Sequence, residues 1–328
     1  MSTSTRIAVV LLASATLWGC VSHPAGNAGD GARVTISKQA DADALDVVVD
    51  GQLFTTYHFS NDNLKPFLWP VLGEGGVPMT RPWPMGEAED KTDHPHHKSF
   101  WTAYGDLNGA DCWAEGDNSG RQVSGTPEFG SGDDYGWIKV VNSWQNHDGA
   151  PVITEAREYR FYAGPPDARA VDVAVTFTAT EGDVLFKDTK EGGIVSLRVR
   201  DCIRADRSGT ITNALGGAGE KECWGKPSPW CDYSGPFEDG KVRGITVMDH
   251  PSNLRHPSRW HVRNYGLMGA NCFGLSHFTK GEAEQLNGDY TLKKGESLTF
   301  HYRVLVHSGT PEQAKVAERF AEYAASKP

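Results

Sequence analysis

Residues 45–59 read LDVVVDGQLFTTYHF, two short runs of β-branched and aromatic residues on either side of Asp50-Gly51. An Asp-Gly pair between two such runs is a strong hairpin signal, because a tight turn needs backbone angles that these two residues tolerate. The preceding stretch, residues 32–37, alternates in the same way. This part of the chain therefore predicts antiparallel strands joined by a tight turn.

Similar alternating or β-branched runs continue along the chain. They lie at 136–144, 152–162, 169–178, 194–200, 243–249, 270–278 and 297–307, between turns rich in Gly, Asp and Pro. One helix is predicted at the end, where Thr310 to Gln313 form a capping box before apolar residues at helical spacing. Many strands and few helices indicate stacked antiparallel sheets. We predict an all-β fold, a large antiparallel β-sandwich with long loops over 60–135 and 201–240 and a C-terminal helix.

The first twenty residues have the layout of a bacterial export signal. Arg6 precedes an apolar run from Ile7 to Trp18, which is too short to cross a bilayer as a helix. The run ends at Cys20 in a sequence that resembles a lipobox, although ordinary secretion with an incidental Cys20 is the alternative. We predict a lipoprotein signal peptide over 1–20, a tether over 21–31 and a single catalytic domain over 32–328. The predicted location is the periplasm or the outer membrane, with a lipid on Cys20 as the only membrane contact.

Charge and composition restrict the function. The 328 residues include 32 Lys and Arg against 42 Asp and Glu, a net charge of −10. Nucleic-acid affinity depends mostly on cations that neutralise phosphates, so we do not expect a nucleic-acid partner. The sequence also lacks a GxSxG elbow, an HExxH motif and glycine-rich phosphate loops. Without these motifs, nothing in the sequence indicates a serine hydrolase, a kinase or a dehydrogenase.

Two segments concentrate histidines. The stretch 93–98, DHPHHK, holds three imidazoles and a carboxylate within five residues, and the stretch 253–266 adds three Arg, two His, Trp and Tyr. Imidazole exchanges protons near neutrality and also binds metals, so the first segment indicates either acid–base catalysis or a metal site. The second segment is a basic island that suits a carboxylate or a developing alkoxide. The catalytic candidates are His94, His96, His97, Glu115, His261 and Tyr265, and the substrate-binding candidates are Trp101, Arg255, His256, Trp260, Arg263 and Asn264.

Two further segments supply carboxylates and aromatic rings. Residues 187–193 contain a carboxylate pair of the kind that glycosidases use, and residues 222–235 carry two Trp and a Tyr on a Pro-rich loop suited to sugar stacking. Each segment also has a purely structural interpretation, which we weigh equally. Residues 187–193 could form a charged turn, and the aromatic rings of 222–235 could hold a long loop against the core. The candidates are Asp188 and Glu191 for catalysis, and Lys190, Trp224, Trp230 and, from the hairpin, His58 for substrate binding.

Together these motifs resemble an exported bacterial family that carries the label "methane oxygenase PmoA". The resemblance rests on residues 65–67, 93–106, 188–192, 224–233 and 256–266, and covers roughly residues 35–325. It implies a galactose-mutarotase-like supersandwich and a role beside sugar-acting enzymes that degrade plant and algal polymers. The label cannot be literal, because a membrane methane monooxygenase subunit needs several apolar spans of about 20 residues and none follows the signal here.

The leading hypothesis is an exported carbohydrate-active enzyme that cleaves glycosidic bonds of plant or algal polysaccharide fragments. A hydrolase is favoured, with a carboxylic acid as proton donor, and a polysaccharide lyase is the alternative, with His or Tyr as base and Arg neutralising a uronate. A non-catalytic sugar-binding lipoprotein and a metal-dependent enzyme are the other hypotheses. No cofactor is predicted, although the imidazoles would suit a divalent metal. Each enzymatic hypothesis requires imidazoles of the two histidine segments to face one another across a single hollow with aromatic walls.

Overall fold

The structure is a computed structural model of the chain, and it describes residues 31–85 and 93–328. The predicted signal peptide, the predicted lipid attachment at Cys20 and all but the last residue of the predicted tether lie outside the described residues. Among the residues that the structure describes, no helix is long and apolar enough to cross a membrane.

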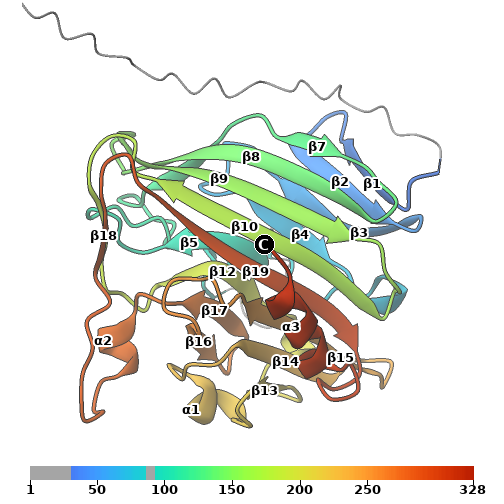
Figure 1. The fold of residues 1–328 in the computed structure, drawn as a ribbon. Helices are drawn as coiled ribbons and strands as arrows, with labels where there is room; N and C mark the ends of the chain where they lie inside the picture. Colours follow the sequence, from blue (N-terminus) through green and yellow to red (C-terminus); the bar gives the residue numbers. More distant parts are fainter. Residues whose placement is uncertain (1–30, 86–92) are drawn as a thin grey trace, which may run out of the picture.

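Two large antiparallel sheets make up most of the fold (Figure 1). The eight-stranded sheet has the spatial order β1 (Val34–Lys38), β2 (Ala44–Val49), β3 (Gln52–His58), β4 (Phe67–Val71), β5 (Phe100–Tyr104), β12 (Gly192–Arg198), β17 (Leu267–Asn271) and β16 (Arg259–Arg263).

The nine-stranded sheet contains the longest strands. Its order is β13 (Thr210–Asn213), β14 (Trp230–Pro236), β15 (Val242–Asp249), β19 (Ser297–Ser308), β10 (Ala168–Thr178), β9 (Pro151–Tyr162), β8 (Tyr135–Gln145) and β6 (Arg121–Ser124), with β7 (Glu128–Gly130) also paired to β8. Smaller elements complete the described fold: the ribbon of β11 (Val184–Phe186) and β18 (Tyr290–Leu292), the helices α1 (Gly219–Cys223), α2 (Leu275–Phe278) and α3 (Val316–Ala325), and the 3-10 turns η1 (Glu74–Gly76) and η2 (Asp201–Ile203).

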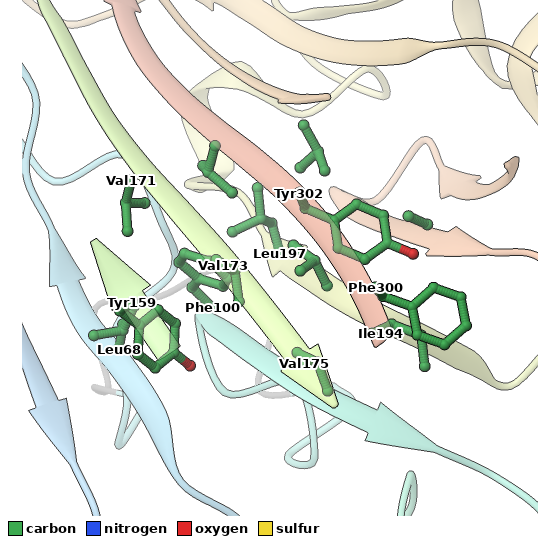
Figure 2. Packing of buried hydrophobic residues seen from close by; sticks show 14 of the residues in the cluster. Leu68, Phe100, Tyr159, Val171, Val173, Val175, Ile194, Leu197, Phe300 and Tyr302 are labelled. Carbon is green, nitrogen blue, oxygen red and sulfur yellow. The ribbon is translucent and has the colours of Figure 1, made fainter. Parts of the chain in front are cut away.

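The hydrophobic core lies between the two sheets (Figure 2). Strand β10 alternates strictly, so that Val171, Val173 and Val175 are buried while their neighbours are half-buried on the other face. They pack in one cluster with Phe100 of β5 and Leu197 of β12. Each such side chain contributes about 1.5–3 kcal/mol when fully buried. Period-two alternation thus joins the two sheets into a sandwich.

The predicted sandwich, hairpin and C-terminal helix are confirmed. Asp50 and Gly51 both have positive φ angles, 51° and 75°, as a two-residue hairpin turn requires. The predicted capping box forms, because the backbone N–H of Thr310 donates to the Gln313 side chain at 2.8 Å. It closes a turn and does not cap the helix, since α3 begins only at Val316, after Lys315 with a φ of 54° and no side-chain cap.

The prediction of two long loops is wrong in part. Strands β4 to β7 lie within residues 60–135, and β13 and β14 lie within 201–240. All five residues of β5 are buried, so this strand has no polar alternation to reveal it. The predicted run 270–278 also divides, because its first residues end β17 and its last residues form α2.

Candidate functional site

A second aromatic cluster lies on the outer face of the eight-stranded sheet, separate from the core. Residues Leu68 and Phe100 belong to the core, whereas Phe67 and Trp101, which are direct partners across β4 and β5, belong to this second cluster. Successive residues of a strand point to opposite faces, which explains the division. Its remaining members are Ala103, Trp113 and Leu267, with Trp69, Trp83 and Tyr265 packed against them.

The three histidines of the DHPHH segment pack on this aromatic face. The ring of His97 stacks on Trp101 at 5.2 Å between ring centres, and it lies edge-on to Trp113 at 5.6 Å. The ring of His94 lies nearly parallel to the rings of His97 and Tyr265, at 4.8 Å from each, and those two rings are 6.3 Å apart. His96 lies beside both rings, 5.7 Å from His94 and 4.5 Å from His97. His97 is only 1% exposed, whereas His94 and His96 are half-buried.

His261, on strand β16, joins the same cluster from the other histidine segment. Its ring stacks on Trp113 at 6.2 Å, so that Trp113 contacts His261 as well as His96 and His97. The side chain is almost fully buried, and its Nδ1 has no hydrogen-bond partner. The two histidine segments therefore meet around one tryptophan, which is the proximity that the enzymatic hypotheses require. The two hollows that the structure describes lie on the other sheet.

Burial keeps these imidazoles neutral. It lowers the pKa of His96 to about 4, with a smaller contribution from the Lys65 ammonium, and lowers the pKa of His261 to about 3. The pKa of His97 also lies well below its ordinary value for the same reason. A neutral imidazole is able to accept a proton at neutral pH. His96 is the most accessible of these three rings and is therefore the best placed to act as a base.

Two buried arginines hold the carboxylate that precedes the histidines. Arg81 and Arg198 approach the same oxygen of Asp93 at 2.9 and 2.8 Å. Although burial opposes ionisation, Arg198, His94 and Arg81 together lower the pKa of Asp93. Arg198 also lies 3.2 Å from Nδ1 of His97. Because a guanidinium only donates, this Nδ1 accepts and the His97 proton resides on Nε2.

Two buried lysines hold Glu115 and the segment that carries Trp113. Glu115 lies 3.3 Å from Lys65 and 2.9 Å from Lys98, and the Lys65 ammonium donates to the backbone carbonyl of Trp113 at 2.6 Å. Lys98 also lies over the ring of Trp83 at 3.3 Å. Our interpretation of the sequence included Glu115 but missed the cations, because burial of a lysine has no signature in the residue pattern.

The rim of the cluster carries several predicted residues. Lys190 and Glu191 form an ion pair, and each is about two-fifths exposed. The guanidinium of Arg263 lies 5.9 Å from the Tyr265 ring and also pairs with a glutamate of helix α1. Asn264 is exposed in the turn between β16 and β17. These residues border the histidine cluster on its open side.

Two more predicted residues lie farther along the same face. His58 stacks on Phe67 at 4.8 Å and its Nε2 bonds to the carbonyl of Trp69 at 2.8 Å. Trp224 packs edge-on against Phe278 at 5.3 Å, and Phe278 in turn lies 6.5 Å from His261. Both residues border the aromatic face without touching the DHPHH histidines.

The structure does not bring two of the predicted tryptophans to the histidines. Trp230 packs with Leu305 and with Val316 and Tyr323 of helix α3, on the nine-stranded sheet. Trp260 points into the sandwich core, where its indole N–H donates to the Ser228 carbonyl at 2.8 Å. Trp260 neighbours His261 on β16, so strand alternation sends it to the opposite face.

Three other predicted residues hold loops together. Arg255 donates to the backbone carbonyls of residues 272, 288 and 289. His256 bonds through Nδ1 to the buried Asp249 at 2.9 Å. Asp188 accepts backbone N–H bonds from Ser276 and Gly288 at 2.8 and 2.7 Å. These contacts explain the residues by structure alone, and none of them involves the histidine cluster.

Metal binding was one of the hypotheses. Within residues 31–85 and 93–328, no group of three or more His, Cys, Asp or Glu side chains is arranged to hold a metal ion. The described imidazoles of this cluster contact aromatic rings, the Arg198 guanidinium and, for His94, the Asp93 carboxylate at 3.2 Å.

The fold and the site define an all-β protein with a histidine and aromatic cluster on the outer face of one sheet. The chain belongs to a family of unknown function, DUF6807, which matches residues 44–321. No curated protein matches the sequence.

Three solved structures are similar only in fold. A glycoside hydrolase family 97 enzyme variant from Pseudoalteromonas sp. strain K8 is 11% identical, with a TM-score of 0.34, and the match covers 84% of this chain and 34% of that one. A putative aldose 1-epimerase from Escherichia coli K12 is 12% identical, with a TM-score of 0.32 and coverage of 84% and 100%. A polysaccharide lyase is 12% identical, with a TM-score of 0.30 and coverage of 89% and 34%. The chain thus spans about a third of the hydrolase and of the lyase, and at these scores the likeness carries no argument about function.

Proposed function

We propose that this chain is an exported carbohydrate-active enzyme that cleaves glycosidic bonds of plant or algal polysaccharide fragments at the outer face of the eight-stranded sheet. The observation that carries the proposal is the meeting of His96 and His261 around Trp113, beside Tyr265. Aromatic rings stack on the C–H faces of sugars, and a neutral imidazole accepts protons. The sequence of residues 1–20 supports export, with a lipid on Cys20 as the anchor.

The charges in the site favour elimination over hydrolysis by two carboxylates. Glycosidases need one carboxyl group that holds a proton. The arginines beside Asp93 favour its charged form and lower its pKa. Glu115 is held by ion pairs with Lys65 and Lys98, and Glu191 by an ion pair with Lys190. An imidazole base requires no protonated carboxyl. The site is therefore better suited to a lyase reaction than to the hydrolysis that the sequence motifs favoured.

In the proposed reaction, a uronate residue binds with its carboxylate toward the rim cations Lys190 and Arg263, which stabilise the charge that develops there. The neutral imidazole of His96 takes the proton from the carbon next to the carboxyl group. A double bond forms between this carbon and the neighbouring ring carbon, and the bond from that neighbour to the glycosidic oxygen breaks. Burial raises the pKa of Tyr265, so its phenol keeps its proton at neutral pH and donates it to the departing oxygen.

Incubation with oligosaccharides that contain uronates, and with neutral ones, tests this proposal. Elimination yields an unsaturated product that absorbs in the ultraviolet, and His96→Ala or Tyr265→Phe should remove it. His147→Ala is the matched control, because this ring is about half exposed and lies outside the cluster. New reducing ends without ultraviolet absorption would replace elimination with hydrolysis. Full loss of activity with a chelator would support the metal-dependent hypothesis.

A second candidate is a sugar-binding protein without catalysis. It is favoured by the burial of His97 and His261, which are 1% and 3% exposed and so offer little surface to a substrate. In that case the oligosaccharides would bind and no product would form with any of them. Binding without turnover across a broad panel would overturn the enzyme proposal.

A further inference from the structure

The nine-stranded sheet carries two adjoining hollows on the face that points away from the core. One has a volume of about 330 Å³ and lies over β9, β10 and β19 beside α3, and the other has about 470 Å³ and lies over β8, β9 and β10. Glu158, Ala174 and Thr176 line both hollows, so the two form one groove. Figure 1 shows these strands side by side, and Tyr323 of α3 lines the first hollow.

Small side chains make the floor of this groove. In the strand register, Ala174 of β10 lies between Glu158 of β9 and His301 of β19, and the next row places Thr176 between Ala156 and Thr299. A flat sheet becomes hollow where alanine and threonine stand between longer side chains. The floor therefore offers hydroxyl groups and an imidazole at the bottom of a shallow channel.

Charged side chains along the groove are already matched. Glu158 pairs with Arg160 at 2.6 Å and with Lys139 at 3.4 Å. Asp172 accepts two bonds from Arg303, at 2.6 and 2.8 Å, and one from the hydroxyl of Tyr162 at 2.7 Å. A ligand with a strong charge of either sign would have to break such pairs.

The other charged lining residues do not change this balance. Glu128 carries a negative charge and Lys327 a positive one, so the two offset each other. The guanidinium of Arg157 is buried in the core against Glu155. The ligand class that fits such a groove is neutral.

Aromatic rings and planar polar groups complete the groove. Tyr162 and Tyr323 line it, and the Arg303 guanidinium lies over both rings, at 5.1 and 4.6 Å. Paired guanidinium and carboxylate groups keep hydrogen-bonding capacity along their edges, and hydroxyl groups are able to both donate and accept. Neighbouring hydroxyls of a sugar match such groups, and the sugar's C–H face matches an aromatic ring.

We propose that this groove is a second carbohydrate site, which binds a neutral oligosaccharide strand without acting on it. It lies on the opposite sheet from the histidine cluster and does not depend on the reaction proposed there. Tyr162 and the floor at Ala174 are the determinants of binding.

Calorimetric titration of the full chain tests the proposal, with short neutral oligomers of glucose, xylose, mannose and galactose and with oligogalacturonate as the acidic comparison. Ala174→Gln fills the floor and Tyr162→Ala removes a ring. The matched control is Thr154→Gln. Thr154 lies on β9, the strand of Tyr162, and on the same face of the sheet, but it lines neither hollow. Circular dichroism and unfolding midpoints establish that each variant is folded.

At least one neutral oligomer should bind, and both groove variants should weaken it by about tenfold or more. Thr154→Gln and His96→Ala should bind as the wild type does, which separates this site from the histidine cluster. The proposal is overturned if no neutral oligomer binds, if oligogalacturonate binds more tightly, or if the groove variants bind normally. Loss of binding in His96→Ala would likewise overturn it, because the ligand would then occupy the other sheet.

Discussion

Replacement of His261 by phenylalanine should change how the stability of this protein depends on pH. Burial lowers the pKa of His261 from its ordinary value of 6.5 to about 3. A difference of this size corresponds to roughly 5 kcal/mol of folding free energy, since each pKa unit is worth about 1.36 kcal/mol. This figure is an upper bound, because water that enters the site near the charged ring would reduce it.

The direction follows from which state binds the proton. In the unfolded chain the imidazole takes up a proton near pH 6.5, whereas the folded chain binds it only near pH 3. The unfolded state therefore holds more protons between these values, and folding weakens as the pH falls. Above pH 6.5 the ring is neutral in both states and costs the fold nothing, and it destabilises the folded state progressively as the pH falls toward 3.

Urea unfolding at a series of pH values measures this effect. In His261→Phe the free energy of unfolding should fall less between pH 6.5 and pH 3 than it does in the wild type, because the variant has no imidazole to protonate at this position. At neutral pH the variant should be at least as stable as the wild type, because it removes a buried nitrogen that has no partner. The exposed ring of His147 provides the control, and His147→Phe should keep the wild-type profile. Parallel profiles for wild type and His261→Phe would refute the reasoning and would mean that the ring is hydrated.

Three other substitutions separate the roles of the remaining residues. Lys65→Met should lower the free energy of unfolding by about 3–5 kcal/mol in urea, because it leaves Glu115 with a single cation and the Trp113 carbonyl without its donor; an unchanged value would mean that this lysine is solvated. Trp230→Ala should cost about 3–5 kcal/mol through loss of packing beneath α3 and leave sugar cleavage unchanged; reduced cleavage in a folded variant would place Trp230 in the site. His96→Ala should abolish cleavage and cost less than about 2 kcal/mol of stability, because the ring is half-buried; retained cleavage would assign the base to another residue.

Local patterns predicted the parts of the fold that local physics controls. The turn at Asp50 and Gly51 depends on backbone angles, and it was found as expected. The terminal helix was also found, but it begins at Val316, several residues after the predicted cap at Thr310. Strand β10 alternates because one face is buried and the other is not. Strand β5 is buried on both faces, so the polar alternation that would have revealed it is missing.

The candidate site was predicted only in part, for a related reason. Histidine clusters stand out by their composition, so 93–98 and His261 were found from the sequence. Their meeting around Trp113 depends on the pairing of β5, β12, β17 and β16, and no local pattern encodes a contact between segments that lie so far apart along the chain.

Residue types and their spacing alone determined an acidic, β-rich chain with one terminal helix and two imidazole-bearing segments, and they predicted an export signal. Tertiary structure decided which side of a sheet each ring occupies, and so why Trp260 faces the core while its neighbour His261 faces the cluster. It also decided that Lys65 and Arg198 are buried beside carboxylates. Composition records which groups a chain carries, but burial and the pairing of charges arise only when distant strands are brought together.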